Sequence, residues 1–237
     1  MTEISSIQTA IADVRNRIDA ACKRSGRNPD EVTLIAVSKT MPVEAIREAM
    51  VCDVIEFGEN RPQELRDKQA MITEPLHWHM IGSLQTNKLK YVIGKTVLIH
   101  SVDSLHLAEE IEKASQKNKL ITEILLEINI AGETSKHGIN PEELENIVRA
   151  VAVLPHIKVR GLMTVAPYTE NAEENRIYFR KMKQLMVDIN LKNIDNITMD
   201  MLSMGMTGDY EIAIEEGATL VRVGTGIFGH RFYPSKE

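Results

Sequence analysis

The stretch TLIAVSKT, residues 33–40, determines how the rest of the chain is interpreted. Its apolar part is too short for a buried helix, and its β-branched residues are typical of a strand that is covered on both faces. Pro42 follows closely, and a helical pattern begins at Val43. Lys39 is therefore expected where a parallel strand ends and a loop begins, which is the edge where α/β folds bind ligands.

The composition is that of a globular chain. Of its 237 residues, 43% are hydrophobic, which is enough for a sizeable core. The net charge of −6 argues against general binding of nucleic acid. Neither of the two cysteines belongs to a CxxC pair, so no zinc site or disulfide framework is indicated. The chain has no signal-like start and no apolar run of about 18 residues, so we expect a cytoplasmic protein that does not bind membranes.

The first segment predicts a helix that precedes the first strand. Apolar residues recur at spacings of three and four, at Ile4, Ile7, Ile11, Val14 and Ile18. Ser5 and Gln8 have the spacing of a capping box. We expect this extra helix to pack on the body of the domain, and a helix reserved for a partner is the alternative.

From Thr33 onward, apolar strands alternate with amphipathic helices. The eight expected strands are residues 33–39, 54–58, 77–82, 97–102, 123–130, 158–165, 199–204 and 219–223. Strict alternation favours a parallel sheet, and eight such units are typical of a (β/α)8 TIM barrel. The alternative, an open doubly wound sheet, usually has a glycine-rich turn after its first strand, and residues 38–41 contain no glycine. Without a linker, residues 1–237 are expected to form a single domain.

Side chains at the strand ends of such a barrel converge on one face. Gly224 and Thr225 follow the eighth strand, where backbone N–H groups can approach an anion, and Ser203 on the seventh strand can donate a hydroxyl. A tight structural turn is the alternative for these glycines. A phosphate site opposite Lys39 indicates a phosphorylated aldehyde held as a Schiff base, either a sugar phosphate or pyridoxal 5′-phosphate (PLP). Arg222 favours PLP, because it is expected to reach a pyridine nitrogen.

At these residues the chain resembles the pyridoxal phosphate homeostasis proteins, whose fold is that of the barrel domain of bacterial alanine racemase. The motifs that carry the resemblance are AVSKT (36–40), FGEN (57–60), WHMIGSLQ (78–85), GETSKHG (132–138), RGLMT (160–164), LSMGM (202–206) and VRVGTGIFG (221–229). They cover essentially the whole chain in the order of the family. The chain departs from the family at Arg61-Pro62 and at Thr207, where Tyr-Val and Ser are more usual, and we expect these changes to affect only loop detail.

The resemblance implies a role in PLP binding for seven residues. Lys39 is implied to be the Schiff-base lysine, and Arg222 to meet the pyridine nitrogen. The phosphate is implied to be held by Ser203, Gly224 and Thr225. Asn60 and Met80 are implied to lie beside the cofactor.

Three further residues have more than one interpretation. Lys136, in the loop after the fifth strand, is expected to be solvated, with a role in admitting or releasing the cofactor as the alternative. His77 and His79 can share one face of a strand. Two histidines without a third ligand do not make a metal site, so no metal is expected.

Two functions remain, a racemase-like PLP enzyme and a PLP carrier. Racemisation needs an acid/base group on each face of the substrate, and in the racemases the second is a tyrosine from a separate domain, which we expect this chain to lack. Its five tyrosines are Tyr91, Tyr168, Tyr178, Tyr210 and Tyr233, and only Tyr168 falls near an expected strand end. Arg222 would also disfavour protonation of the ring nitrogen. We therefore expect a monomeric PLP carrier or reservoir without catalytic residues, with supply of PLP to PLP-dependent apo-enzymes and sequestration of the reactive aldehyde as the alternatives.

Overall fold

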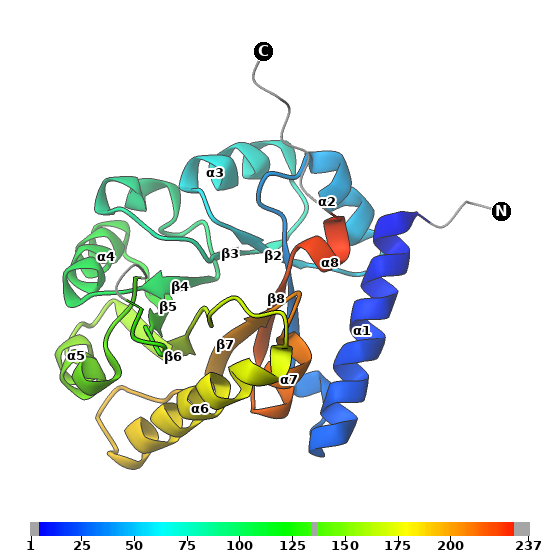
Figure 1. Cartoon of the computed structure of the whole chain (residues 1–237). Coiled ribbons are helices and arrows are strands. Elements are labelled where there is room, and N and C mark those ends of the chain that lie inside the picture. Colours follow the sequence, from blue (N-terminus) through cyan, green and yellow to red (C-terminus); the bar gives the residue numbers. More distant parts are fainter. Residues whose placement is uncertain (1–4, 134–136, 230–237) are drawn as a thin grey trace.

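The computed structural model describes residues 5–133 and 137–229. Its eight strands form a closed barrel in the order β1 to β8, surrounded by helices (Figure 1). Every strand pairing is parallel, and β1 pairs with both β2 and β8, which closes the sheet. The predicted (β/α)8 barrel is confirmed.

The strands are β1 (Thr33–Val37), β2 (Glu56–Glu59), β3 (His77–Met80), β4 (Leu98–Val102), β5 (Thr122–Glu127), β6 (Ile157–Met163), β7 (Met201–Met206) and β8 (Leu220–Val223). The helices are α1 (Ser6–Ser25), α2 (Val43–Met50), α3 (Pro62–Met71), α4 (Leu105–Asn118), α5 (Leu144–Val151), α6 (Arg176–Leu191), α7 (Tyr210–Glu215) and α8 (Thr225–Phe228). Four short 3-10 helices complete the described elements: η1 (Pro29–Glu31), η2 (Thr86–Tyr91), η3 (Pro141–Glu143) and η4 (Ala172–Asn175).

The extra N-terminal helix α1 packs along α2, α7 and α8, as expected (Figure 1). Its first turn is closed by the predicted capping box, in which the Ser5 hydroxyl accepts a hydrogen bond of 3.2 Å from the Gln8 amide, and Gln8 Oε1 accepts one of 3.2 Å from the Ser5 amide. Arg24 forms ion pairs with Glu211 and Glu215 of α7. The helix is therefore joined to the barrel by an apolar stripe and by surface charges.

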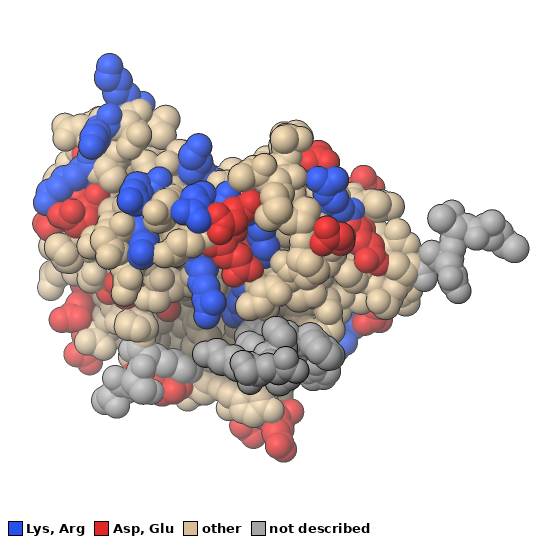
Figure 2. Space-filling model, turned by 90° about the horizontal axis from the view of Figure 1, so that it is seen from above, with Lys and Arg blue, Asp and Glu red and all other residues tan. Residues whose placement is uncertain are grey.

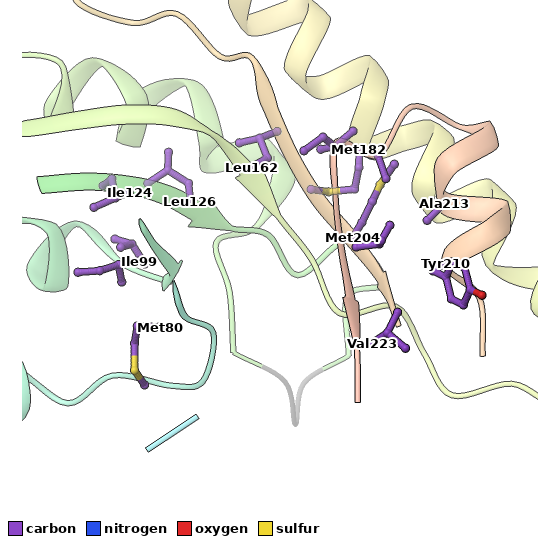
Figure 3. Packing of buried hydrophobic residues seen from close by; sticks show 14 of the residues in the cluster. Met80, Ile99, Ile124, Leu126, Leu162, Met182, Met204, Tyr210, Ala213 and Val223 are labelled. Atoms are coloured by element: carbon purple, nitrogen blue, oxygen red, sulfur yellow. The ribbon is translucent and has the colours of Figure 1, made fainter. Parts of the chain in front are cut away.

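Two apolar clusters fill the molecule, one on each side of the strands. Successive side chains of a strand point to opposite faces. On β5, Ile124 and Leu126 belong to the larger cluster between strands and helices (Figure 3). Leu125 belongs to a small separate cluster that fills part of the barrel interior, formed by Ile35, Leu98, Leu125, Met163 and Leu220.

Strand β7 lies two residues further along the chain than predicted, at residues 201–206 instead of 199–204. Its pairing with β8 shifts register between Ser203 and Met206. Gly205 has a φ of +88° at this shift, and a Cβ there would lie 2.6 Å from Ala213 Cβ. Because β7 continues past this register shift to Met206, Ser203 lies within the barrel wall. Thr207, which follows the strand, lies at the barrel mouth.

The surface seen from above in Figure 1, over α2 and α3, carries Lys and Arg side chains interspersed with Asp and Glu (Figure 2). This face differs from the unbroken basic surface that is typical of nucleic-acid-binding proteins. Of the helices in residues 5–133 and 137–229, none is both long enough and apolar enough to span a lipid bilayer.

Candidate functional site

A pocket of about 420 Å³ lies at the carboxyl ends of β1, β2, β7 and β8. Its volume falls within the roughly 300–1,000 Å³ typical of small-molecule sites. Five of the seven predicted site residues line it: Lys39, Asn60, Arg222, Gly224 and Thr225. The remaining lining residues are Val37, Ile81, Val165, Met206, Thr207 and Gly208. The barrel thus collects residues from both ends of the sequence around one cavity.

Lys39 is half-buried in the loop after β1, and a buried ionic cluster outside the barrel wall fixes that loop. Lys68 Nζ donates hydrogen bonds of 2.7 Å to the Ser38 carbonyl, to Glu59 Oε1 and to Glu64 Oε1. The Ser38 hydroxyl donates one of 2.7 Å to the same oxygen of Glu59. Burial raises the pKa of the Glu59 carboxyl, against the opposing effect of Lys68 and Ser38. The residue before Lys39 is therefore held through both its carbonyl and its hydroxyl.

The residue after Lys39 adopts an uncommon backbone conformation. Thr40 has a φ of +65°, which is rare for a β-branched residue and costs about 1–3 kcal/mol. Its amide donates a hydrogen bond of 2.6 Å to Glu64 Oε1, the oxygen that also accepts from Lys68. The strained turn and the ionic cluster together orient Lys39 toward the pocket that it lines.

Arg222 enters the pocket from β8 and is almost completely buried. Arg222 Nη1 donates a hydrogen bond to the Ser203 hydroxyl, and Arg222 Nη2 donates one of 2.8 Å to the Thr164 carbonyl. Burial lowers the pKa of Arg222 to about 10, while Glu127 and Asp209 act in the opposite direction. The guanidinium is therefore a fixed cation at neutral pH.

The turn after β8 meets the loop after β7 at the pocket wall. The Gly226 amide donates a hydrogen bond of 3.2 Å to the Thr207 hydroxyl. Both Thr207 and Gly208 line the pocket beside Gly224 and Thr225. We expected the change at Thr207 to affect only loop detail, and the structure places Thr207 in the pocket wall, a position that the misplaced end of β7 hid.

Asn60 lines the pocket and has one buried polar atom without a partner. Its Oδ1 is buried and has no hydrogen-bond partner among the described residues. Gly82 packs against its backbone, where an added Cβ would lie 2.6 Å from the Asn60 carbonyl oxygen. Because a buried polar atom without a partner costs about 1–3 kcal/mol, this oxygen is suited to accept a hydrogen bond from a ligand.

Two predicted residues do not line the pocket. Ser203 is completely buried, and its hydroxyl contacts Arg222 and His100. Met80 packs in the outer core between strands and helices (Figure 3). Its orientation follows from the strand, because the preceding His79 points into the barrel and contacts His100. We therefore assign Ser203 a supporting role behind Arg222 and omit Met80 from the site.

His77 and His79 do share a face, but they share it with a carboxylate. His77 Nδ1 lies 2.7 Å from Glu56 Oε1, and His79 Nε2 lies 2.7 Å from Glu56 Oε2. Among the residues that the structure describes, no group of three or more His, Cys, Asp or Glu side chains is arranged to hold a metal ion. Lys136 and Tyr233, which the sequence singled out, lie outside the described residues.

Several known proteins are similar to this chain over almost its whole length. The family described as alanine racemase, N-terminal domain, matches residues 11–232. A relative from Aquifex aeolicus, named pyridoxal phosphate homeostasis protein, is 47% identical over 224 residues and covers 94% of this chain and 97% of the relative. The solved structure of PipY from Synechococcus elongatus with PLP bound is 35% identical, with a TM-score of 0.79, and covers 91% of this chain and 100% of that chain.

The alanine racemase of Clostridium difficile shares the fold alone, at 16% identity and a TM-score of 0.73 over 97% of this chain and 57% of that chain. Fold and pocket together define a racemase-type (β/α)8 barrel with a lysine at its mouth. At the level of sequence, the chain belongs to the pyridoxal phosphate homeostasis protein family within the alanine racemase N-terminal domain family.

Proposed function

We propose that this protein binds PLP in the pocket at the barrel mouth and holds it as a Schiff base on Lys39. One observation carries the proposal: Lys39, Arg222 and the turn at Gly224 and Thr225 surround one cavity together with Asn60. PLP has an aldehyde, a ring nitrogen and a phosphate, and the cavity has a suitable group for each. The name of the Aquifex aeolicus relative and the PLP-bound structure of PipY support this assignment.

Each lining residue has a role that follows from its chemistry. The uncharged amine of Lys39 forms a C=N bond with the aldehyde carbon, and water leaves. The backbone N–H groups at Gly224 and Thr225, with the Thr207 hydroxyl, bind the phosphate oxygens. Arg222 donates a hydrogen bond to the ring nitrogen, and Asn60 Oδ1 accepts one from the ligand. When bound, PLP supplies an electrophilic carbon and an electron-withdrawing ring.

The absorbance spectrum tests this binding. Addition of PLP to the wild-type protein should produce a visible band distinct from that of free PLP, because a protonated C=N bond replaces the aldehyde C=O in conjugation with the ring. Lys39→Ala should not show this band, whereas Lys95→Ala, which changes a lysine that does not line the pocket, should retain it. A band of equal strength in Lys39→Ala would contradict the proposal.

The pocket favours carriage of PLP over catalysis with it. Deprotonation and reprotonation of an amino acid at Cα require two acid/base groups on opposite faces. Lys39 serves one face, and none of the tyrosines in residues 5–133 and 137–229 lines the pocket. Tyr168 is 93% exposed, and Tyr210 is buried on α7. The cationic Arg222 opposes protonation of the ring nitrogen, which weakens the ring as an electron sink.

Proton exchange separates a carrier from an enzyme. The PLP-loaded protein, incubated with a panel of amino acids in deuterated water, should exchange Cα protons no faster than free PLP does. The loaded protein should then restore activity to a PLP-dependent apo-enzyme. Exchange far above that of free PLP would identify a second acid/base group and a racemase-like enzyme.

A further inference from the structure

A row of buried hydrogen bonds crosses the barrel interior and ends at Arg222. Glu56 Oε2 lies 2.7 Å from His79 Nε2, and His79 Nδ1 lies 3.0 Å from His100 Nε2. His100 Nδ1 lies 2.9 Å from the Ser203 hydroxyl, which accepts from Arg222. His79 and Arg222 are each 4% exposed, and His100 and Ser203 are not exposed at all. The row thus joins β2, β3, β4, β7 and β8, and it is buried except at Glu56, whose side chain is 22% exposed.

The chemistry of arginine sets the direction of these hydrogen bonds. A guanidinium only donates, so Ser203 accepts from Arg222, and its own proton is available to His100 Nδ1. Burial, with nearby His79 and Arg222, lowers the pKa of His100 well below its usual value, so its ring is neutral. A neutral ring that accepts at Nδ1 carries its proton at Nε2 and donates it to His79 Nδ1.

The row ends on a carboxylate. His79, which accepts at Nδ1, donates from Nε2 to Glu56. Burial acts to raise the pKa of Glu56, but the hydrogen bonds from His79 and His77 outweigh it and lower that pKa below its usual value. In the opposite direction, Ser203 would accept from both Arg222 and His100, and its own buried proton would be left without any of these partners, at a cost of about 1–3 kcal/mol. One direction therefore satisfies every group from Arg222 to Glu56.

We propose that His100, supported by His79 and Glu56, is a positioning residue for Arg222. It fixes the Ser203 hydroxyl, and Ser203 together with the Thr164 carbonyl fixes the guanidinium where a ring nitrogen is recognised. His100 itself does not line the pocket, so it acts on the ligand only through Ser203 and Arg222. This inference rests on the proposed PLP binding and names the residues that give the site its selectivity for a pyridine ring.

The tautomer of His100 provides a test that needs no ligand. Nitrogen-15 NMR of the ligand-free wild-type protein should show His100 as a neutral ring with the proton on Nε2 and an accepting Nδ1. A proton on Nδ1, or a positively charged ring at neutral pH, would overturn the inference. Because this measurement uses the wild-type protein, it tests the role of His100 even if a variant at His100 fails to fold.

Ligand selectivity provides the second test, with PLP compared with 1-deaza-PLP, in which carbon replaces the ring nitrogen and the phosphate and aldehyde remain. Wild-type protein should prefer PLP by roughly tenfold, the effect of one charge-assisted hydrogen bond. His100→Leu should bring this preference close to one while the affinity for 1-deaza-PLP changes little. His100→Asn, which keeps an acceptor near Nδ1, should restore part of the preference.

His106→Leu, which changes an exposed histidine on α4, should behave as wild type. Equal weakening of both ligands by His100→Leu would indicate a purely structural role and overturn the inference, as would a retained preference for PLP. A wild-type protein that binds neither ligand would instead refute the proposed PLP site itself. Failure of the inference and failure of the proposed function are therefore distinct results.

Discussion

Glu127 ends β5 inside the barrel, and its carboxyl responds to pH differently from an exposed glutamate. Burial raises its pKa from 4.5 to about 7, with a further contribution from Asp103, while Arg222 and His137 act in the opposite direction. Between these two pKa values the folded state keeps a proton that the unfolded state releases, so this group reduces stability as pH rises from about 4.5 to 7.

Glu127→Gln should therefore become more stable relative to wild type as pH rises, by up to about 3 kcal/mol between pH 4 and pH 8. Urea unfolding of both proteins across this range measures the difference. Glu170→Gln, at an exposed position, should show no such trend. A difference between Glu127→Gln and wild type that does not depend on pH would show that the carboxyl titrates normally in the fold.

Thr207 was missed as a site residue, and its hydroxyl provides a sharp test of the phosphate site. Thr207→Val keeps the side-chain shape but removes the acceptor for the Gly226 amide and a donor to the pocket. We expect PLP affinity to fall roughly fivefold, and affinity for pyridoxal, which has no phosphate, to stay the same. Thr198→Val, at an exposed position, is the matched control. Equal losses for both ligands would place the effect outside the phosphate site.

At the scale of elements, helix α3 supports the Lys39 loop through Lys68. Lys68→Met leaves the buried carboxyl of Glu59 without its cation, and we expect a loss of about 3–5 kcal/mol in the free energy of unfolding. The double variant Lys68→Met/Glu59→Gln should recover part of this loss. Lys113→Met, which removes an exposed ion pair with Glu110, should change stability little. Chemical denaturation of wild type, Lys68→Met, Glu59→Gln, the double variant and Lys113→Met tests this, and additive effects of the Lys68 and Glu59 changes would contradict a coupled pair.

Local sequence patterns predicted the elements better than their registers. The alternation of strands and helices and the Ser5–Gln8 capping box follow from neighbouring residues, and the structure has both. The end of β7 depends on a register shift against β8, which is a property of the pairing. The outward direction of Met80 likewise depends on which face of β3 turns inward, and that face carries His79, whose partners Glu56 and His100 come from other strands.

At the scale of the whole molecule, closure of the barrel brings the site together. Residues at the carboxyl ends of barrel strands converge on one face, which predicted that Lys39 and Arg222 would share a pocket. Lys39 follows the first strand, and Arg222 lies on the last. The buried row behind Arg222 could not be predicted in this way, because His79 and His100 are 21 residues apart and His100 and Ser203 are 103 apart. The monomeric state and the supply of PLP to apo-enzymes stay predictions.

The covalent attachment of PLP to Lys39 can be located in the protein itself. The protein is loaded with PLP, reduced with borohydride and digested, and the pyridoxyl group is located by mass spectrometry. We expect the modification at Lys39, the lysine that lines the pocket with Arg222. A pyridoxyl group found chiefly on Lys136, or spread over many lysines, would contradict it.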